Sequence, residues 1–307
     1  MKTALLIDGN AIMHRAYHAL PPFKTKEGIP TNALYGFLTI LKKAVTDFQP
    51  HYLIVCFDTP VPTFRKKLYK EYQSHRPKME DDLSCQFSAV KEALDKAGII
   101  HVEKAGFEAD DVIGTITKKL GKQGERVLIL TGDRDIMQLV NKNTFVVTPQ
   151  IGFAQTKIYD PAAVKEKLGI EPEKIPDLKA LMGDSSDNYK GAKGIGPKTA
   201  AKLLNEYHSV KSVLANLDKI DGKPQQLLQD YKDNILLAHQ LATIKTDVDI
   251  DIKLDKTVFN GFNDGLKEVL QKYQMSSLIK RFFEDKQTAK PEKKESKKSD
   301  KDQMGLF

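Results

Sequence analysis

The 307-residue chain has little of what would place it in a membrane, an oxidising compartment or a zinc site. It has two cysteines, Cys56 in the apolar run YLIVCF and Cys85 in a polar stretch. Neither has metal-ligand spacing, so both are expected to be reduced and structural. The opening run ALLI is interrupted by Asp8, and neither a membrane-spanning run nor a secretory signal pattern is visible. The sequence therefore predicts a cytoplasmic protein that does not contact a membrane.

Charge of both signs is abundant. Charged residues make up 29% of the chain and hydrophobic residues 40%, which is typical of a globular protein, and the length favours about two domains. The net charge of +7 and the pI near 9.0 permit an anionic partner such as nucleic acid, although many basic proteins bind none. The positions of the charges are therefore more informative than their sum.

Five short β-rich runs alternate with helical patterns in the first half of the chain. Continuous apolar runs of this kind are typical of parallel strands buried on both faces. The sequence therefore predicts an α/β domain over residues 1–175, with a mostly parallel central sheet flanked by helices. The five predicted strands span residues 3–8, 52–58, 99–103, 126–133 and 145–149.

The second half changes character. From about residue 176, helical patterns separated by glycine turns predict a helical region over 176–285. Residues 286–302 are charged and nearly free of apolar side chains, so a disordered linker is expected there. No repeat of 20 to 50 residues is visible.

Nine carboxylates occur in five short patterns. Each alone could cap a helix or a turn. Several follow predicted strands, however, and ligands of open α/β sheets bind at the carboxyl ends of the strands. Oxygen ligands that converge there favour Mg²⁺ or Mn²⁺, and no His or Cys cluster competes for zinc. Two such ions, about 4 Å apart, are the usual apparatus for phosphodiester hydrolysis. The nine are Asp8, Asp58, Glu108, Asp110, Asp111, Asp133, Asp135, Asp184 and Asp187.

A basic stretch follows the second predicted strand. Residues 64–78 contain six Lys or Arg residues against one acid, interleaved with aromatic side chains. Basic side chains can bind a phosphate backbone, and aromatic faces can stack single-stranded bases at ~1–3 kcal/mol each. A solvated basic helix is the alternative interpretation.

The segment GAKGIGPKTA, residues 191–200, is a glycine turn that opens a helix. Backbone N–H groups at such a position can hold a phosphate without reading sequence. Pro197 breaks the spacing of a Walker P-loop, so we favour contact with a DNA backbone through Gly194, Gly196, Lys198 and Thr199. A plain turn between two helices is the alternative.

Six ordered motifs resemble those of one family: IDGN, FR with YQSHR, FEADDVIG, TGDRD, MGDSSDN and GIGPKTA. They are similar, over about residues 3–285, to the 5′-nuclease domain of bacterial DNA polymerase I, within the flap endonuclease superfamily. The resemblance implies a PIN-like nuclease core, a helical arch over residues 60–90 through which a 5′ single strand passes, and a C-terminal helix-hairpin-helix-like DNA-binding region.

The resemblance also implies roles for the acids. One divalent ion is expected near Asp8, Asp58 and Asp110. A second is expected near Glu108, Asp133, Asp135 and Asp184, with Asp111 and Asp187 in supporting positions. A monovalent cation such as K⁺ is expected at the helix-hairpin-helix-like turn.

DNA contacts are implied for a further set of residues. Arg15 and Tyr17 match positions near the cleavage point, and Arg76 is also expected to act in catalysis. Gln73 stands where the family usually has lysine, and losing that contact costs ~1.5–3 kcal/mol unless Lys70 substitutes. Tyr189 and Lys190 also depart from the family pattern. The arch contacts expected are Arg65, Lys66, Lys70, Tyr72, Gln73 and Arg76.

The last residues suggest a partner. In QMGLF, residues 303–307, the side chains of Gln303, Leu306 and Phe307 resemble the peptide by which bacterial replication proteins bind the sliding clamp. A polymerase would continue well beyond residue 290, so a stand-alone nuclease is expected.

These features predict a monomeric, metal-dependent 5′-3′ exonuclease and flap endonuclease of replication and repair. Its expected substrates are DNA with 5′ flaps, nicks and RNA-primed ends, cleaved by two divalent ions. A non-catalytic, clamp-recruited DNA-binding protein is the alternative, favoured by Gln73. A related nuclease of structured RNA is a third hypothesis, which the arch-like stretch and the glycine turn disfavour.

Overall fold

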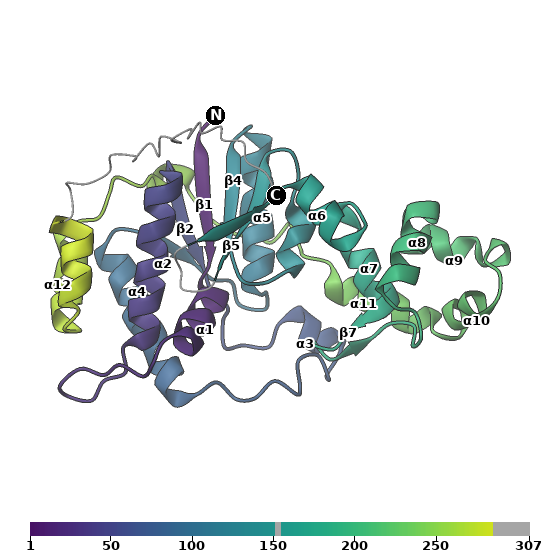
Figure 1. The fold of residues 1–307 in the computed structure, drawn as a ribbon, viewed down its shortest axis with the longest axis horizontal. Coiled ribbons are helices and arrows are strands. Elements are labelled where there is room, and N and C mark those ends of the chain that lie inside the picture. The colour runs from purple at the N-terminus through teal and green to yellow at the C-terminus, as the bar shows by residue number, and fades with distance from the viewer. Residues whose placement is uncertain (151–154, 285–307) are drawn as a thin grey trace, which may run out of the picture.

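The computed structural model describes residues 1–150 and 155–284, and a six-stranded sheet forms its centre (Figure 1). The strand order is β3-β2-β1-β4-β5-β6, with β6 antiparallel to β5 and the other neighbours parallel. The predicted mostly parallel sheet is thereby confirmed. Its strands are β1 (Thr3–Asp8), β2 (Tyr52–Cys56), β3 (Ile100–Val102), β4 (Arg126–Leu130), β5 (Thr144–Pro149) and β6 (Thr156–Tyr159). The sequence analysis missed β6, since this edge strand has only one buried residue and no apolar run.

The strands are buried on both faces. Successive side chains of β1 point to opposite sides, so Leu5 and Ile7 pack in one core, whereas Ala4 and Leu6 pack in the other. The first core is formed with α1 (Gly9–Ala19), α2 (Asn32–Phe48) and α4 (Asp81–Lys96), and the second with α5 (Ala109–Lys122) and α6 (Pro161–Leu168). This two-sided burial accounts for the continuous apolar runs of the sequence.

A helical lobe extends to one side of the sheet (Figure 1). A two-stranded ribbon at its start packs so closely that a Cβ on Gly191 would lie 2.4 Å from the Gly183 nitrogen, so only glycine fits there. The lobe comprises η3 (Pro172–Lys174), α7 (Ile175–Met182), the ribbon β7 (Gly183–Asp184) and β8 (Tyr189–Lys190), α8 (Pro197–Tyr207), α9 (Val210–Ala215), η4 (Leu217–Lys219), α10 (Lys223–Asp230) and α11 (Lys232–Ala242).

The chain then returns to the sheet. After η5 (Leu254–Thr257), α12 (Asp264–Lys272), α13 (Ser276–Ile279) and η6 (Lys280–Glu284) lie on the other side of the molecule, where Leu266 and Leu270 join the core beneath α4. Residues 176–285, predicted as one helical region, thus occupy two places, because the apolar face of α12 is buried by α4 and not by the lobe. No helix in the described part of the chain is long and apolar enough to cross a membrane.

The arch segment is helical only at its two ends. α3 (Phe64–Leu68) is followed by turns over residues 70–75 and by irregular chain over residues 77–80 before α4 begins. Gln73 has a left-handed φ of 53°, and Pro77 lacks an N–H and disfavours helix at the residue before it. Both interrupt the helix that the basic stretch would otherwise favour.

Candidate metal and DNA site

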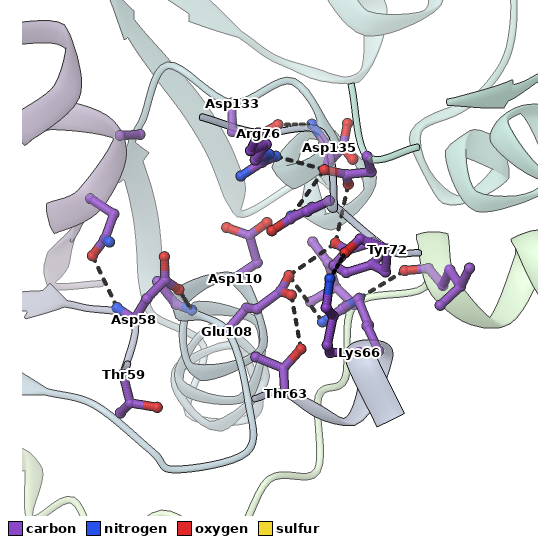
Figure 2. Close-up of a pocket in the computed structure, with 18 of the residues that line it drawn as sticks. Asp58, Thr59, Thr63, Lys66, Tyr72, Arg76, Glu108, Asp110, Asp133 and Asp135 are labelled. Atoms are coloured by element: carbon purple, nitrogen blue, oxygen red, sulfur yellow. Dashed lines mark hydrogen bonds and ion pairs between the residues drawn. The ribbon is translucent and has the colours of Figure 1, made fainter. Parts of the chain in front are cut away.

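Acidic side chains meet at the carboxyl end of the parallel sheet. Asp8 ends β1, Asp58 follows β2, and Asp133 follows β4, as their strand-end positions predict. Figure 2 shows Asp58, Glu108, Asp110, Asp133 and Asp135 around one space. The cavity there has a volume of about 480 Å³ and is also lined by Asp8 and Asp187.

Three of these acids have no cationic partner. The Asp8 carboxylate caps α1 by accepting from the Ala11 N–H (2.9 Å) and also accepts from the Thr131 hydroxyl (2.6 Å). Asp58 accepts from the Ala109 N–H at the start of α5 (2.6 Å). Within residues 1–150 and 155–284, no Lys, Arg or His forms an ion pair with Asp8, Asp58 or Asp110. We call these three the unpaired trio.

Burial makes the charged state of this trio unfavourable. It raises the pKa of Asp8 to about 7, and the neighbouring Asp58 and Asp133 carboxylates add to the shift. Burial, followed by repulsion from Asp133, also raises the pKa of Asp110 well above its usual value. A positive charge in the cavity would reverse both shifts, so the trio has the electrostatics of a cation site.

A second trio carries its own cations. Oxygen atoms of Asp135, Asp184 and Asp187 all lie within 4.8 Å of one another, and this is the one such group found among the described residues. The Lys179 ammonium contacts both Asp135 and Asp184, and an Arg76 N–H donates to Asp187 (2.6 Å). We call these three acids the paired trio. Asp187, expected only in a supporting position, is a full member of it.

The internal cations act on the pKa values of the paired trio. Burial raises the pKa of Asp135 to about 6, helped by Asp133 and opposed by Lys179. At Asp184 burial also acts upward, but the hydrogen bonds from Lys179 and Ser186 outweigh it, so that its pKa is lowered. The two trios therefore have different electrostatics.

Two further acids lie between the trios. Glu108 accepts from the hydroxyl groups of Thr63 (3.2 Å) and Tyr72 (3.2 Å) and pairs with Arg65 (3.3 Å). Burial nevertheless raises its pKa to about 7. Asp133 accepts from the Asp135 N–H (2.8 Å). Both line the cavity, where they could bind either of two cations.

Asp111 does not face the cavity. Its carboxylate is fully buried and makes a two-pronged pair with Arg65 (2.7 and 2.9 Å), and it also accepts from the Glu108 and Lys245 N–H groups. Its oxygens are thus engaged by protein donors and shielded from solvent, which suits the supporting position that the sequence analysis gave it better than direct binding of a metal ion.

Two residues predicted to contact DNA, Arg65 and Tyr72, are buried in this structure. Arg65 is 2% exposed and donates to the Leu241 and Thr243 carbonyl groups as well as to Asp111. Tyr72 is 3% exposed, and its hydroxyl donates to Glu108 and Asp187. Both side chains thus bind protein groups and hold the base of the arch against the acids.

The remaining arch residues are more accessible. Lys70 and Arg76 are exposed, whereas the Lys66 ammonium donates to the Tyr72 carbonyl (2.7 Å). Gln73 donates through its side-chain amide to Asp187 (2.9 Å). The residue at the family's usual lysine position therefore holds an acid of the paired trio.

The other predicted contacts lie at two places. Arg15 on α1 donates to the Gln150 carbonyl (2.9 Å), and the neighbouring Tyr17 is partly buried. In the glycine turn, Gly196 caps α8, and Gly194, Gly196 and Lys198 are exposed while Thr199 is half-buried. The predicted clamp-binding residues Gln303, Leu306 and Phe307 lie outside the described residues.

The sequence analysis missed Lys179, although the spacing LKALMGD places it one helical turn or so before Asp184. It also missed Thr131, whose hydroxyl donates to Asp8, and Asn10, whose side-chain oxygen Oδ1 accepts from the Asp58 N–H (3.0 Å). His14 lines the same cavity. A residue that pairs with a strand-end acid from another element leaves no local pattern, so only the fold reveals it.

The residues present fit divalent metal ions. The acids that line the cavity offer only oxygen ligands, and burial raises the pKa values of Asp8 and Glu108, so a bound cation would favour their ionised forms. A mostly parallel sheet with such a cavity at its carboxyl edge, flanked by a helical lobe, is an arrangement suited to metal-dependent hydrolysis.

Comparison with known families makes this specific. Residues 3–169 match the 5′-3′ exonuclease N-terminal resolvase-like domain, and residues 170–265 match the 5′-3′ exonuclease C-terminal SAM fold. The chain therefore belongs to the 5′-3′ exonuclease family. The nuclease class predicted from the six sequence motifs is confirmed.

Two relatives illustrate the match. A 5′-3′ exonuclease of Aquifex aeolicus (strain VF5) is 39% identical over 285 residues, covering 91% of this chain and 95% of that protein. DNA polymerase I of Bacillus subtilis (strain 168) is 40% identical over 286 residues, covering 92% of this chain but 32% of the polymerase. The chain thus spans about a third of the polymerase and nearly all of the exonuclease.

Solved structures share the fold. The bacteriophage T5 flap endonuclease, in a pseudo-enzyme-product complex with DNA and metal ions, superposes with a TM-score of 0.67 at 21% identity, covering 89% of this chain and all of that one. The catalytic core of Rad2 in complex with a DNA substrate gives 0.58 at 19% identity, covering 91% and 90% of the two chains.

Proposed function

We propose that this chain hydrolyses phosphodiester bonds of DNA at 5′ flaps, nicks and RNA-primed ends, as a monomer that requires Mg²⁺ or Mn²⁺. The observation that carries the proposal is the gathering of seven carboxylates around one cavity, beside the exposed cations of the arch. Mutual repulsion among so many carboxylates is unfavourable, and bound cations would offset it. The family supports the 5′-3′ polarity.

Each trio would hold one ion. Asp8, Asp58 and Asp110 are suited to one, and Asp135, Asp184 and Asp187 to the other, with Glu108 and Asp133 between them. Bound divalent ions supply an activated water and stabilisation of the leaving oxygen. Arg65 and Asp111 keep the start of α5 in place, so that Glu108 and Asp110 face the cavity.

The chain's own cations would position the DNA. Arg76 is exposed and lines the cavity, and Lys70 is an exposed cation of the same segment, so both would bind phosphates of the incoming strand. Arg15 and Tyr17 would contact the strand near the cleaved bond. The turn of Gly194, Gly196, Lys198 and Thr199, helped by a K⁺ ion, would hold the downstream duplex backbone.

A cleavage assay with a 5′-labelled flap tests this function. The wild type should cut near the junction in Mg²⁺ and not in EDTA. Asp110→Asn should lose cleavage, whereas Asp264→Asn, at an exposed acid on α12, should retain it. Lack of wild-type cleavage with either metal would contradict the proposal.

Gln73 supports the second candidate, a non-catalytic DNA-binding protein, because it is bound to Asp187 and brings no charge to the arch. Flap binding without cleavage would identify this function. Cleavage of a structured RNA but not of the DNA flap would favour the third hypothesis.

We also propose that Gln303, Leu306 and Phe307 bind a bacterial sliding clamp, on the grounds of sequence alone. Deletion of residues 303–307 should abolish clamp binding in a pull-down with purified clamp, while cleavage of short flaps is unchanged. Clamp binding that survives the deletion would disprove it.

A further inference from the structure

Lys179 stands between two of the acids that are suited to the second ion. It lies on α7, and its ammonium contacts Asp135, at the start of η1 (Asp135–Leu139), and Asp184 on β7. Its side chain is 19% exposed, and those of the two acids are 18% and 10% exposed. One chain cation thus joins two acids from separate segments in a largely desolvated place.

The contact satisfies the acids without a metal. Asp184 also accepts from the Ser186 N–H (2.7 Å) and hydroxyl, and the third acid of the trio, Asp187, is held by Arg76, Gln73 and Tyr72. Every member of the paired trio therefore has a partner of the protein's own. In the unpaired trio, the donors that Asp8 and Asp58 have among the described residues are neutral backbone N–H groups and a hydroxyl.

We propose that Lys179 is a built-in substitute for the second ion, which neutralises Asp135 and Asp184 when that ion is absent and weakens its binding. The inference rests on the proposed function in one respect only, namely that the paired trio binds a divalent ion. It assigns to Lys179 no contact with DNA.

The chemistry of lysine suits this role. Its ammonium is a compact charge on a flexible four-carbon stem, so it can leave the two carboxylates without any movement of the backbone. Until it leaves, an incoming ion meets like charge at close range and finds two of its ligands engaged. Displacing Lys179 therefore opposes binding at the paired trio and leaves the unpaired trio unaffected.

Calorimetric titration with Mg²⁺ alone, at pH 8 and without DNA, tests the inference independently of cleavage. Lys179→Met keeps most of the stem and removes the charge, and Lys179→Gln keeps a hydrogen-bond donor. We expect two binding events in the wild type, and the weaker one to tighten by roughly tenfold or more in both variants. The tighter event should not change.

Lys190→Met is the matched control, because Lys190 lies on β8, is paired in register with Gly183 and is exposed. It removes the same kind of charge from the strand paired with the one that carries Asp184, and it should leave both events unchanged. Lys179→Arg keeps the charge and should leave the second event weak.

Thermal unfolding gives a second readout. In EDTA, Lys179→Met should unfold at a lower temperature than wild type, and Mg²⁺ should restore it by a larger shift than in wild type. Equal second-ion affinity in Lys179→Met and wild type would overturn the inference, even if the wild type cleaves flaps. Tighter binding without any flap cleavage would uphold the inference and contradict the proposed function.

Discussion

The unpaired trio and the paired trio solve the same problem of crowded acids in opposite ways. Asp8 and Asp110, like Asp58, have no ion pair, and burial raises the pKa of both. In the paired trio, Lys179 and Arg76 supply the positive charge, and the pKa of Asp184 is lowered. Within the described residues, one half of the site thus lacks the direct ion pairs that the other half contains.

The two trios show two ways in which crowded carboxylates can be held in place without a bound metal ion. Carboxylates at the ends of β1 and β2 are fixed by the sheet, so they stay close together, and burial raises their pKa values. The carboxylates of the paired trio are held by the flexible side chains of Lys179 and Arg76, so a metal ion can replace the positive charge of these side chains. We expect the first half to bind its ion more tightly than the second.

The largest effect should be on the cleavage rate, where the difference between the halves disappears. Asp110→Asn and Asp184→Asn should each lower the single-turnover rate on a flap substrate in Mg²⁺ by about a thousandfold, roughly 4 kcal/mol of activation free energy, because both halves contribute to one site. A rate in Asp184→Asn within tenfold of wild type would mean that the paired trio is not part of the active site.

The next largest effect should be on the stability of the protein, through the buried ion pair between Arg65 and Asp111. Arg65→Met should destabilise the protein by about 3–5 kcal/mol, because it leaves the fully buried Asp111 carboxylate without its pair. Denaturant unfolding measures this loss. Arg76→Met is the control, since the Arg76 side chain is 52% exposed and its pair with Asp187 should contribute about 0–1 kcal/mol. Equal losses of unfolding free energy in the two variants would contradict the conclusion that the buried Arg65–Asp111 pair stabilises the fold.

Gln73→Lys tests whether the missing charge at the arch limits the cleavage rate. The variant removes one hydrogen bond from Asp187 and restores a charge at the arch, so the cleavage rate should rise roughly tenfold at saturating substrate. Gln73→Met loses the same hydrogen bond without gaining a charge and should not accelerate cleavage. A gain in both variants would mean that Gln73 acts by holding Asp187 rather than by lacking charge.

Much of the fold was predictable because parallel strands buried on both faces leave continuous apolar runs, and all five such runs form strands. The clustering of Asp8, Asp58 and Asp133 followed from their strand-end positions. The edge strand β6 and the return of α12 to α4 were not predictable, since neither leaves a local signal that differs from a loop or a lobe helix.

The roles of individual charged residues were less predictable than their presence. The basic run around Arg65 suggested a DNA contact, and the acidic run around Asp111 suggested a place at the metal site. In the structure these two side chains form an ion pair with each other. Their separation of 46 residues hides the pair from any local pattern. Lys179 was overlooked for the same reason, because Asp135 comes from another element.

The smallest effect is on the stability of the metal-free protein, and its sign should differ between the halves. At pH 8 in EDTA, Asp110→Asn relieves repulsion and should raise the melting temperature by a few degrees, on the order of 1 kcal/mol. Asp184→Asn takes a partner from Lys179 and should lower it. Shifts of the same sign would remove the distinction between the trios.

The pH dependence of the wild type follows from the same charges. The pKa values of Asp8 and Glu108, about 7, and of Asp135, about 6, lie above the usual 3.8 to 4.5. Because folding raises these values, their contribution to stability is complete below about pH 4 and is lost as pH rises through 6 to 7. In EDTA the melting temperature should therefore fall between pH 5 and pH 8 in the range where these groups titrate. Mg²⁺ should reduce the fall, since a bound cation favours the ionised carboxylates, and an equal fall with and without Mg²⁺ would place the titrating groups away from the metal site.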